Sequence, residues 1–272
     1  MNQAAIETLL RRDRVITLAA LSGLVLAAWG YLLYLAYGMS DEAMSDMPGM
    51  PGMSITMPAM HPWSWIEFAA LSVMWVVMMA AMMIPAAAPM ILTFAAVHRR
   101  RSEEGRPAVP TAVFIAGYLL VWSAFSVLAA AGQAALHATA LLSPAMAAAS
   151  PVVAGVLLIA AGVFQWTPLK RACLSACRSP LSFLMSRWRE GRAGSLLIGV
   201  QHGLYCLGCC WALMGLLFVV GVMNLLWVAV IAAIVLIEKV APRGDVLARV
   251  GGAALVAAGA ILLARVGFQA HS

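Results

Sequence analysis

Between Ala193 and Ile237 the chain contains no Asp, Glu, Lys or Arg. A membrane-spanning helix needs only about 20 consecutive apolar residues, and a water-exposed loop without a charge over this range is implausible. The whole chain has the same character, with 64% apolar and 10% charged residues, whereas soluble domains have about 45–50% and about 25%. The sequence therefore predicts an all-α, polytopic transmembrane helical bundle, built as a single membrane domain over residues 1–272.

Apolar runs separated by basic or proline-rich stretches predict about seven spans, six to seven in all. They are expected at residues 15–37, 63–97, 111–136, 152–166, 193–221, 225–237 and 246–264. Lys and Arg gather at 11–14, 99–106, 170–192 and 239–249, and cytoplasmic loops are the ones enriched in these residues. Seven spans then place the amino terminus in the cytoplasm and the carboxy terminus outside. The first apolar run lacks a clear cleavage site and is expected to be retained as a helix.

Residues 38–62 form a methionine-rich segment that is expected to be an external loop. From Met39 to His61 it carries seven methionines and no Lys or Arg, and its prolines prevent a continuous helix. Thioethers bind Cu(I) without losing a proton, so the segment could collect this ion; the alternative is a disordered linker. The candidate ligands are Met47, Met50, Met53, Met57, Met60 and His61.

The expected second span has methionines in helical register. Met74, Met78 and Met82 recur every four residues, so they share one face of a helix. Such stripes commonly serve as adaptable core packing. Because this one follows the external methionine-rich segment, it could also continue a thioether path into the membrane.

The uncharged run contains a second column of potential metal ligands. His202, Cys206 and Cys210 are each four residues apart, Cys209 is three from Cys206, and Met214 continues the column. Residues at these spacings share a face, and imidazole, thiolate and thioether suit a soft or borderline metal such as Cu(I) or Zn(II). The alternative is that the cysteines only pack as small apolar side chains.

The stretch 170–192 is expected to be a basic cytoplasmic loop. It contains Cys173 and Cys177, which one helical turn would bring together for metal binding or thiol chemistry. The pair lacks the CxxC spacing of redox folds and zinc knuckles. Residues 181–188 are expected to form a helix lying on the membrane surface.

Several motifs resemble those of the DUF2182 family, bacterial integral membrane proteins described as predicted metal-binding proteins. The matching stretches are Met78-Met79-Ala80-Ala81-Met82-Met83-Ile84-Pro85 with Pro89-Met90, Gln165-Trp166-Thr167-Pro168-Leu169-Lys170, Cys173 and Cys177-Arg178-Ser179-Pro180, Gly203 to Met214, Gly221-Val222-Met223-Asn224, and Glu238-Lys239. The resemblance implies a multi-pass protein of the bacterial inner membrane that binds a metal.

The favoured function is Cu(I) binding for transport, storage or delivery to another membrane or periplasmic metalloprotein. Zinc is the main rival metal, because cysteine and histidine alone do not distinguish the two. Two other functions stay open, a membrane thiol redox protein and a structural or assembly subunit. The sequence also leaves open whether the chain forms a homo-oligomer. No paired carboxylates or nucleophile–base pairs occur in the spans, so enzymatic turnover is not favoured. The net charge of +6 is explained by basic loops without a nucleic-acid partner.

Overall fold

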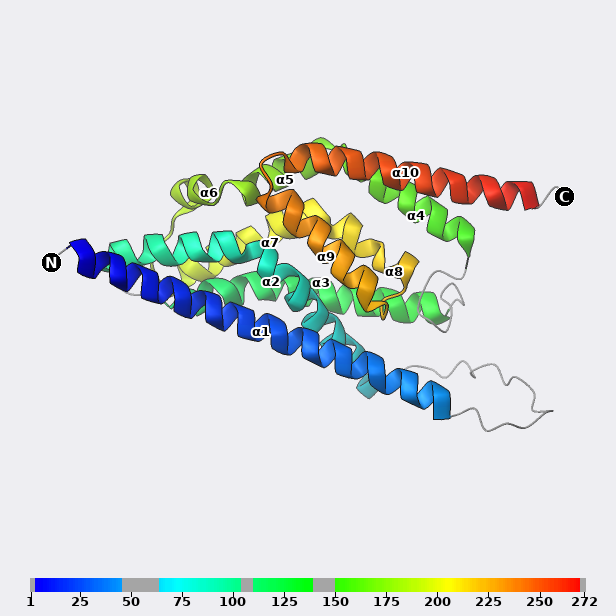
Figure 1. The fold of residues 1–272 in the computed structure, drawn as a ribbon, viewed down its shortest axis with the longest axis horizontal. Helices are drawn as coiled ribbons and strands as arrows, with labels where there is room; N and C mark the ends of the chain where they lie inside the picture. Colours follow the sequence, from blue (N-terminus) through cyan, green and yellow to red (C-terminus); the bar gives the residue numbers. More distant parts are fainter. Residues whose placement is uncertain (1–2, 46–63, 104–109, 139–149, 270–272) are drawn as a thin grey trace.

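The structure is a computed structural model that describes residues 3–45, 64–103, 110–138 and 150–269. All regular elements in these residues are helices; the long helices run roughly along one axis, with the start of α1 and the end of α10 at opposite ends (Figure 1). They are α1 (Gln3–Ser45), α2 (Trp65–Glu103), α3 (Thr111–Ala138), α4 (Pro151–Phe164), α5 (Pro168–Arg178), α6 (Pro180–Arg187), α7 (Gly191–Gly215), α8 (Leu217–Val220), α9 (Leu225–Val240) and α10 (Gly244–Gln269).

Five stretches in the described residues are long and apolar enough to cross a membrane. They are Val15–Tyr37, Trp65–Arg101, Thr111–His137, Gly191–Val220 and Gly244–Phe268. A sixth exists if α4 and α5, which bend by 62° relative to each other, count as one broken span. The chain is therefore a multi-pass helical membrane protein, as predicted.

The predicted number of about seven spans counts 152–166 and 225–237 as full crossings, and here the structure differs. α4 has 14 residues and α9 has 16, which gives lengths of about 21 and 24 Å against a hydrocarbon core of about 30 Å. α4 is short because the chain turns at residues 165–167, before Pro168 begins α5. α9 is short because Asn224 caps its start, accepting a hydrogen bond from the Trp227 amide at 3.4 Å, and Pro242 follows its end.

The core forms where α2 packs against α1, α3 and α9, and where α3 packs against α7. The α3–α7 contact is close because α7 carries glycines there. A methyl group added at Gly203 would lie 3.0 Å from the Val121 side chain, and one at Gly199 would meet the Phe114 carbonyl group. Small residues allow such close helix approach in membranes, and the approach sets how α7 faces its neighbours.

The basic stretch predicted as a loop at 170–192 contains two helices. α5 starts at Pro168, with the Thr167 side chain accepting a hydrogen bond from the Lys170 amide at 3.3 Å, and α6 starts at Pro180. Proline in the first turn and threonine at the cap are ordinary helix starts. α6 contains most of the predicted surface helix at 181–188. The helices α5 and α7 pack against each other, so α5 forms part of the wall of the bundle.

The predicted external segment 38–62 lies largely outside the described residues, which resume at Ser64. Its first part, to Ser45, belongs to α1. No proline occurs in the sequence before Pro48 at this end, so nothing there forces the helix to stop earlier.

Candidate metal centre

The sulfur-rich face of α7 lies at the centre of the bundle. Cys206, Cys209 and Cys210 are all buried, and the thiols of Cys209 and Cys210 each donate to the Cys206 carbonyl oxygen, at 3.0 and 2.9 Å. The Tyr118 hydroxyl on α3 lies 3.1 Å from Cys206 Sγ and 3.0 Å from the carbonyl oxygen of Met83 on α2. The predicted column of thiols on one helix face is therefore present, enclosed by α2 and α3.

The two cysteines of α5 join this face. Cys177 lies close to Cys209, and Cys173 Sγ would lie 2.8 Å from a methyl group added at Gly208. All five cysteines of the chain therefore gather at one place, and all are buried and free. We call this set the thiol cluster: Cys173, Cys177, Cys206, Cys209 and Cys210. The sequence predicts a loop at Cys173 and Cys177, whereas the structure places both on the helix α5, which packs against α7.

A lysine from α9 reaches the thiol cluster. Lys239 Nζ lies 2.9 Å from Cys206 Sγ, and its side chain is buried. The preceding residue, Glu238, forms a 2.6 Å ion pair with Lys170 of α5, which is 1% exposed. Two positive charges and one negative charge are thus buried together. Because net charge is costly in such an environment, a thiolate at Cys206 would balance the charge of this group.

Sequence reasoning missed these three charged residues as parts of the site. It treated the positions after residue 237 and those beginning at 170 as water-exposed loop ends, because charges usually mark the ends of spans. Two adjacent charges after an apolar run, such as Glu238 and Lys239, indicate a buried site only when the residues that they pair with are known. Those partners, Lys170 and Cys206, come from other helices.

His202 lies one turn before Cys206 in a pocket of aromatic rings. Its ring centre is 5.5 Å from that of Tyr118, 5.8 Å from that of Phe183 and 6.1 Å from that of Phe114. Both ring nitrogens are buried and have no hydrogen-bond partner among the described residues. Buried polar atoms are normally paired. The unpaired imidazole of His202 therefore has a nitrogen available to bind a metal ion.

The predicted methionine stripe on α2 is buried inside the bundle, and Met214 on α7 is buried as well. Met74, Met78 and Met82 have exposures of 7%, 1% and 1%. The thioether that lies against a thiol is that of the next residue, Met83, whose Sδ is 4.0 Å from Cys210 Sγ. The candidate ligands Met47, Met50, Met53, Met57, Met60 and His61 lie outside the described residues.

The donor set fits a soft metal better than a hard one. Within the described ranges, no three His, Cys, Asp or Glu side chains converge so as to hold a metal ion. A metal–thiolate bond is about 2.3 Å long, so two sulfurs 4.0 Å apart, as in Cys210 and Met83, can both bind one ion lying between them. Thiolate and thioether ligands favour soft or borderline metals such as Cu(I) and Zn(II) over hard cations such as Mg²⁺ and Ca²⁺.

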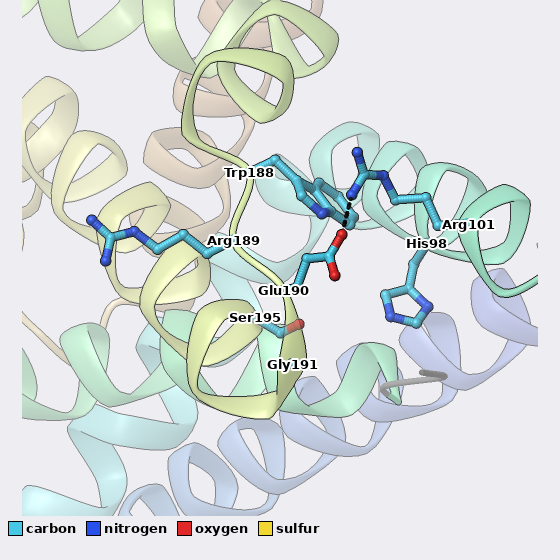
Figure 2. A pocket seen from close by; sticks show the side chains of 7 residues that line it. All are labelled: His98, Arg101, Trp188, Arg189, Glu190, Gly191 and Ser195. Carbon is cyan, nitrogen blue, oxygen red and sulfur yellow. Dashed lines mark hydrogen bonds and ion pairs between the residues drawn. The ribbon is translucent and has the colours of Figure 1, made fainter. Parts of the chain in front are cut away.

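A second pocket lies away from the sulfurs, at the end of α2 near the start of α7. Figure 2 shows the Glu190 carboxylate meeting the Arg101 guanidinium, an ion pair of 2.9 Å, with Trp188 beside them. Arg101 also lies 4.7 Å from the centre of the Trp188 ring. These contacts fix the link between α6 and α7 to α2. No sulfur atom lines this pocket, which sets it apart from the thiol cluster.

Comparison with known proteins identifies one family. A family model described as PpoB2: Copper chaperone matches residues 72–262, which is more than half of the chain. This is the family formerly called DUF2182, so the resemblance drawn from the sequence motifs is confirmed. No curated protein and no solved structure matches the chain.

Proposed function

We propose, because this chain belongs to the PpoB2 family of copper chaperones, that the thiol cluster holds its copper cargo as Cu(I) inside the membrane. Cys206 and Cys210 are the thiolate ligands in this proposal, and Met83 supplies a thioether. His202 stands one turn away as the entry or exit ligand. As in any chaperone, the ion is then passed to a copper-accepting recipient.

The observation that carries the proposal is that all five cysteines lie on the packed faces of α5 and α7, with Met83 Sδ 4.0 Å from Cys210 Sγ. If the cysteines served only as small packing residues, we would not expect Cys173 and Cys177 of α5 to lie beside the cysteine-bearing face of α7. Soft sulfur donors in a dry site favour Cu(I) over harder ions, and they also protect it from oxidation by excluding water.

Charge balance also supports Cu(I) held by two thiolates. Such a complex has a net charge of −1, and Lys239, at 2.9 Å from Cys206 Sγ, supplies the compensating positive charge. The ion and its ligands then add no net charge to the bundle interior, where uncompensated charge is costly. Zn(II) with the same ligands would leave one positive charge in excess.

A route for the ion follows from the methionines. In this proposal the segment 38–62 collects Cu(I) outside the bacterial inner membrane, and the buried stripe Met74, Met78 and Met82 leads it along α2 to Met83. Thioethers exchange soft ions without gaining or losing protons, which suits transfer between equivalent sites. This route requires the predicted cytoplasmic amino terminus, with the candidate span Val15–Tyr37 of α1 crossing the membrane.

The decisive experiment measures copper in the full chain purified in detergent under reducing, anaerobic conditions. The wild type should retain about one Cu(I) per chain, with an absorption edge typical of Cu(I), and Cys206→Ser/Cys210→Ser should lose it. Ser195→Ala is the matched control, because Ser195 is a buried polar residue on the same helix outside the thiol cluster. A wild type that takes up no Cu(I), or a double variant that binds it normally, would contradict the proposal.

A further inference from the structure

We infer that the pocket between α5 and the adjoining ends of α4 and α10 binds a phosphate ester of the kind found in anionic lipid headgroups. This pocket, which we call the basic pocket, has a volume of about 250 Å³. The residues used in the argument are Gln165, Lys170, Arg171, Arg178, Asp245 and Arg249. This site is separate from copper binding and goes beyond the proposed function.

Two of the four cations in the basic pocket are already neutralised. Lys170 pairs with Glu238 at 2.6 Å. Arg178 donates to the carbonyl oxygens of Ala241 and Pro242, at 2.8 and 2.6 Å. It also pairs with Asp245 at 3.4 Å, and this pair neutralises the only carboxylate that lines the pocket.

Arg171 and Arg249 remain. Both are exposed, and neither has an acidic partner in the part of the chain that the structure describes. They come from different helices, α5 and α10, and both line the pocket. Because a guanidinium group presents a planar fork of donors that matches a phosphate, two such groups at one pocket predict an anion with several oxygens.

Gln165 adds a second requirement for the ligand. Its side chain is 2% exposed, and its Oε1 has no hydrogen-bond partner among the described residues, although it lines the basic pocket. A buried acceptor of this kind calls for a donor from the ligand. An anionic headgroup with a free hydroxyl, such as that of phosphatidylglycerol, supplies a phosphate for the arginines and a hydroxyl for Gln165.

The basic pocket lies where headgroups are found. Asp245, Ala248 and Arg249 belong to the first turns of α10, at the start of the candidate span Gly244–Phe268. Trp166, half exposed, donates its indole N–H to the Arg249 carbonyl oxygen at 3.1 Å. Tryptophan concentrates at the membrane–water boundary, and basic pockets between membrane helices at that level bind anionic headgroups.

The test is native mass spectrometry of the delipidated full chain, titrated with phosphatidylglycerol, phosphatidylcholine or phosphatidic acid of the same acyl chains. We expect phosphatidylglycerol to bind in preference to phosphatidylcholine. Arg171→Gln and Arg249→Gln should each weaken that binding about tenfold, as expected for losing one charge-assisted contact. Gln165→Leu should remove the preference for phosphatidylglycerol over phosphatidic acid, which lacks the free hydroxyl groups.

The matched control is Arg243→Gln, which removes the same charge from an exposed residue nearby that does not line the basic pocket. Equal weakening in this control, or equal binding of phosphatidylcholine, would overturn the inference. Inorganic phosphate distinguishes the source: competition at millimolar concentration indicates a free phosphate ligand, and no competition indicates the lipid headgroup. If Arg171→Gln does not fold, Arg249→Gln and the charge-preserving Arg171→Lys test the same site.

Discussion

The thiol cluster and the basic pocket lie on opposite sides of the same helix. α5 turns Cys173 and Cys177 toward α7, while Arg171 faces the pocket beside α10. The buried charges beside the thiol cluster all have partners: Lys239 lies against Cys206, and Lys170, which also reaches the basic pocket, pairs with Glu238. In the basic pocket two exposed arginines have none among the described residues. The difference shows that a buried charge, from which water is excluded, is paired with an opposite charge of the protein. A charge that water or lipid headgroups can reach stays available to bind a ligand.

The largest effect should come from removing the buried carboxylate. Glu238→Ala leaves Lys170 buried without a counter-charge, and breaking a buried ion pair by removing one partner costs about 3–5 kcal/mol. The free energy of unfolding in detergent, or the thermal midpoint, measures the loss. Glu190→Ala is the matched control, since it breaks the partly exposed pair with Arg101 and should cost at most about 1 kcal/mol. Equal losses in the two variants would show that Lys170 does not depend on Glu238.

Helical spacing was sufficient to predict the α7 part of the thiol cluster. His202, Cys206 and Cys210 share a face because the helix repeats every 3.6 residues, and that needs no tertiary information. The position of α5 could not be predicted in this way. The arginines of this stretch predict a water-exposed loop, although the same turns carry the cysteines that face α7. Only the packing of α5 on α7 shows that the stretch is a helix in the wall of the bundle.

The methionines of α2 also show that helical spacing alone does not predict which residue contacts the thiols. Met82 and Met83 are adjacent in sequence, so their side chains point about 100° apart around the helix. The spacing of the stripe selects Met74, Met78 and Met82, yet Met83 is the residue whose sulfur lies beside Cys210. The orientation of α2 is set by its contacts with α1, α3 and α9, which a single sequence does not contain.

The next largest effect should distinguish the lysine of the thiol cluster from the arginines of the basic pocket. Lys239→Met removes the positive charge that compensates bound copper, so Cu(I) affinity should fall ten- to a hundredfold, or about 1.4–2.7 kcal/mol. Competition with a Cu(I) chelator measures this affinity. Lys239→Arg should recover part of it, because the charge is kept, whereas a lost packing contact would not be recovered by the larger side chain. Arg249→Gln should leave copper affinity unchanged.

The smallest effect should come from the single thioether at the cluster. Met83→Leu keeps the size and apolar character of the side chain but removes the sulfur that lies 4.0 Å from Cys210 Sγ. We expect about a tenfold loss of Cu(I) affinity and one fewer sulfur neighbour in the X-ray absorption spectrum of the copper-loaded protein, with phosphatidylglycerol binding unaltered. Met185→Leu, at an exposed position on α6, is the matched control and should change neither property. An unaltered sulfur count in Met83→Leu would mean that the ion is held by thiols alone, and that the thioether path along α2 ends before it reaches them.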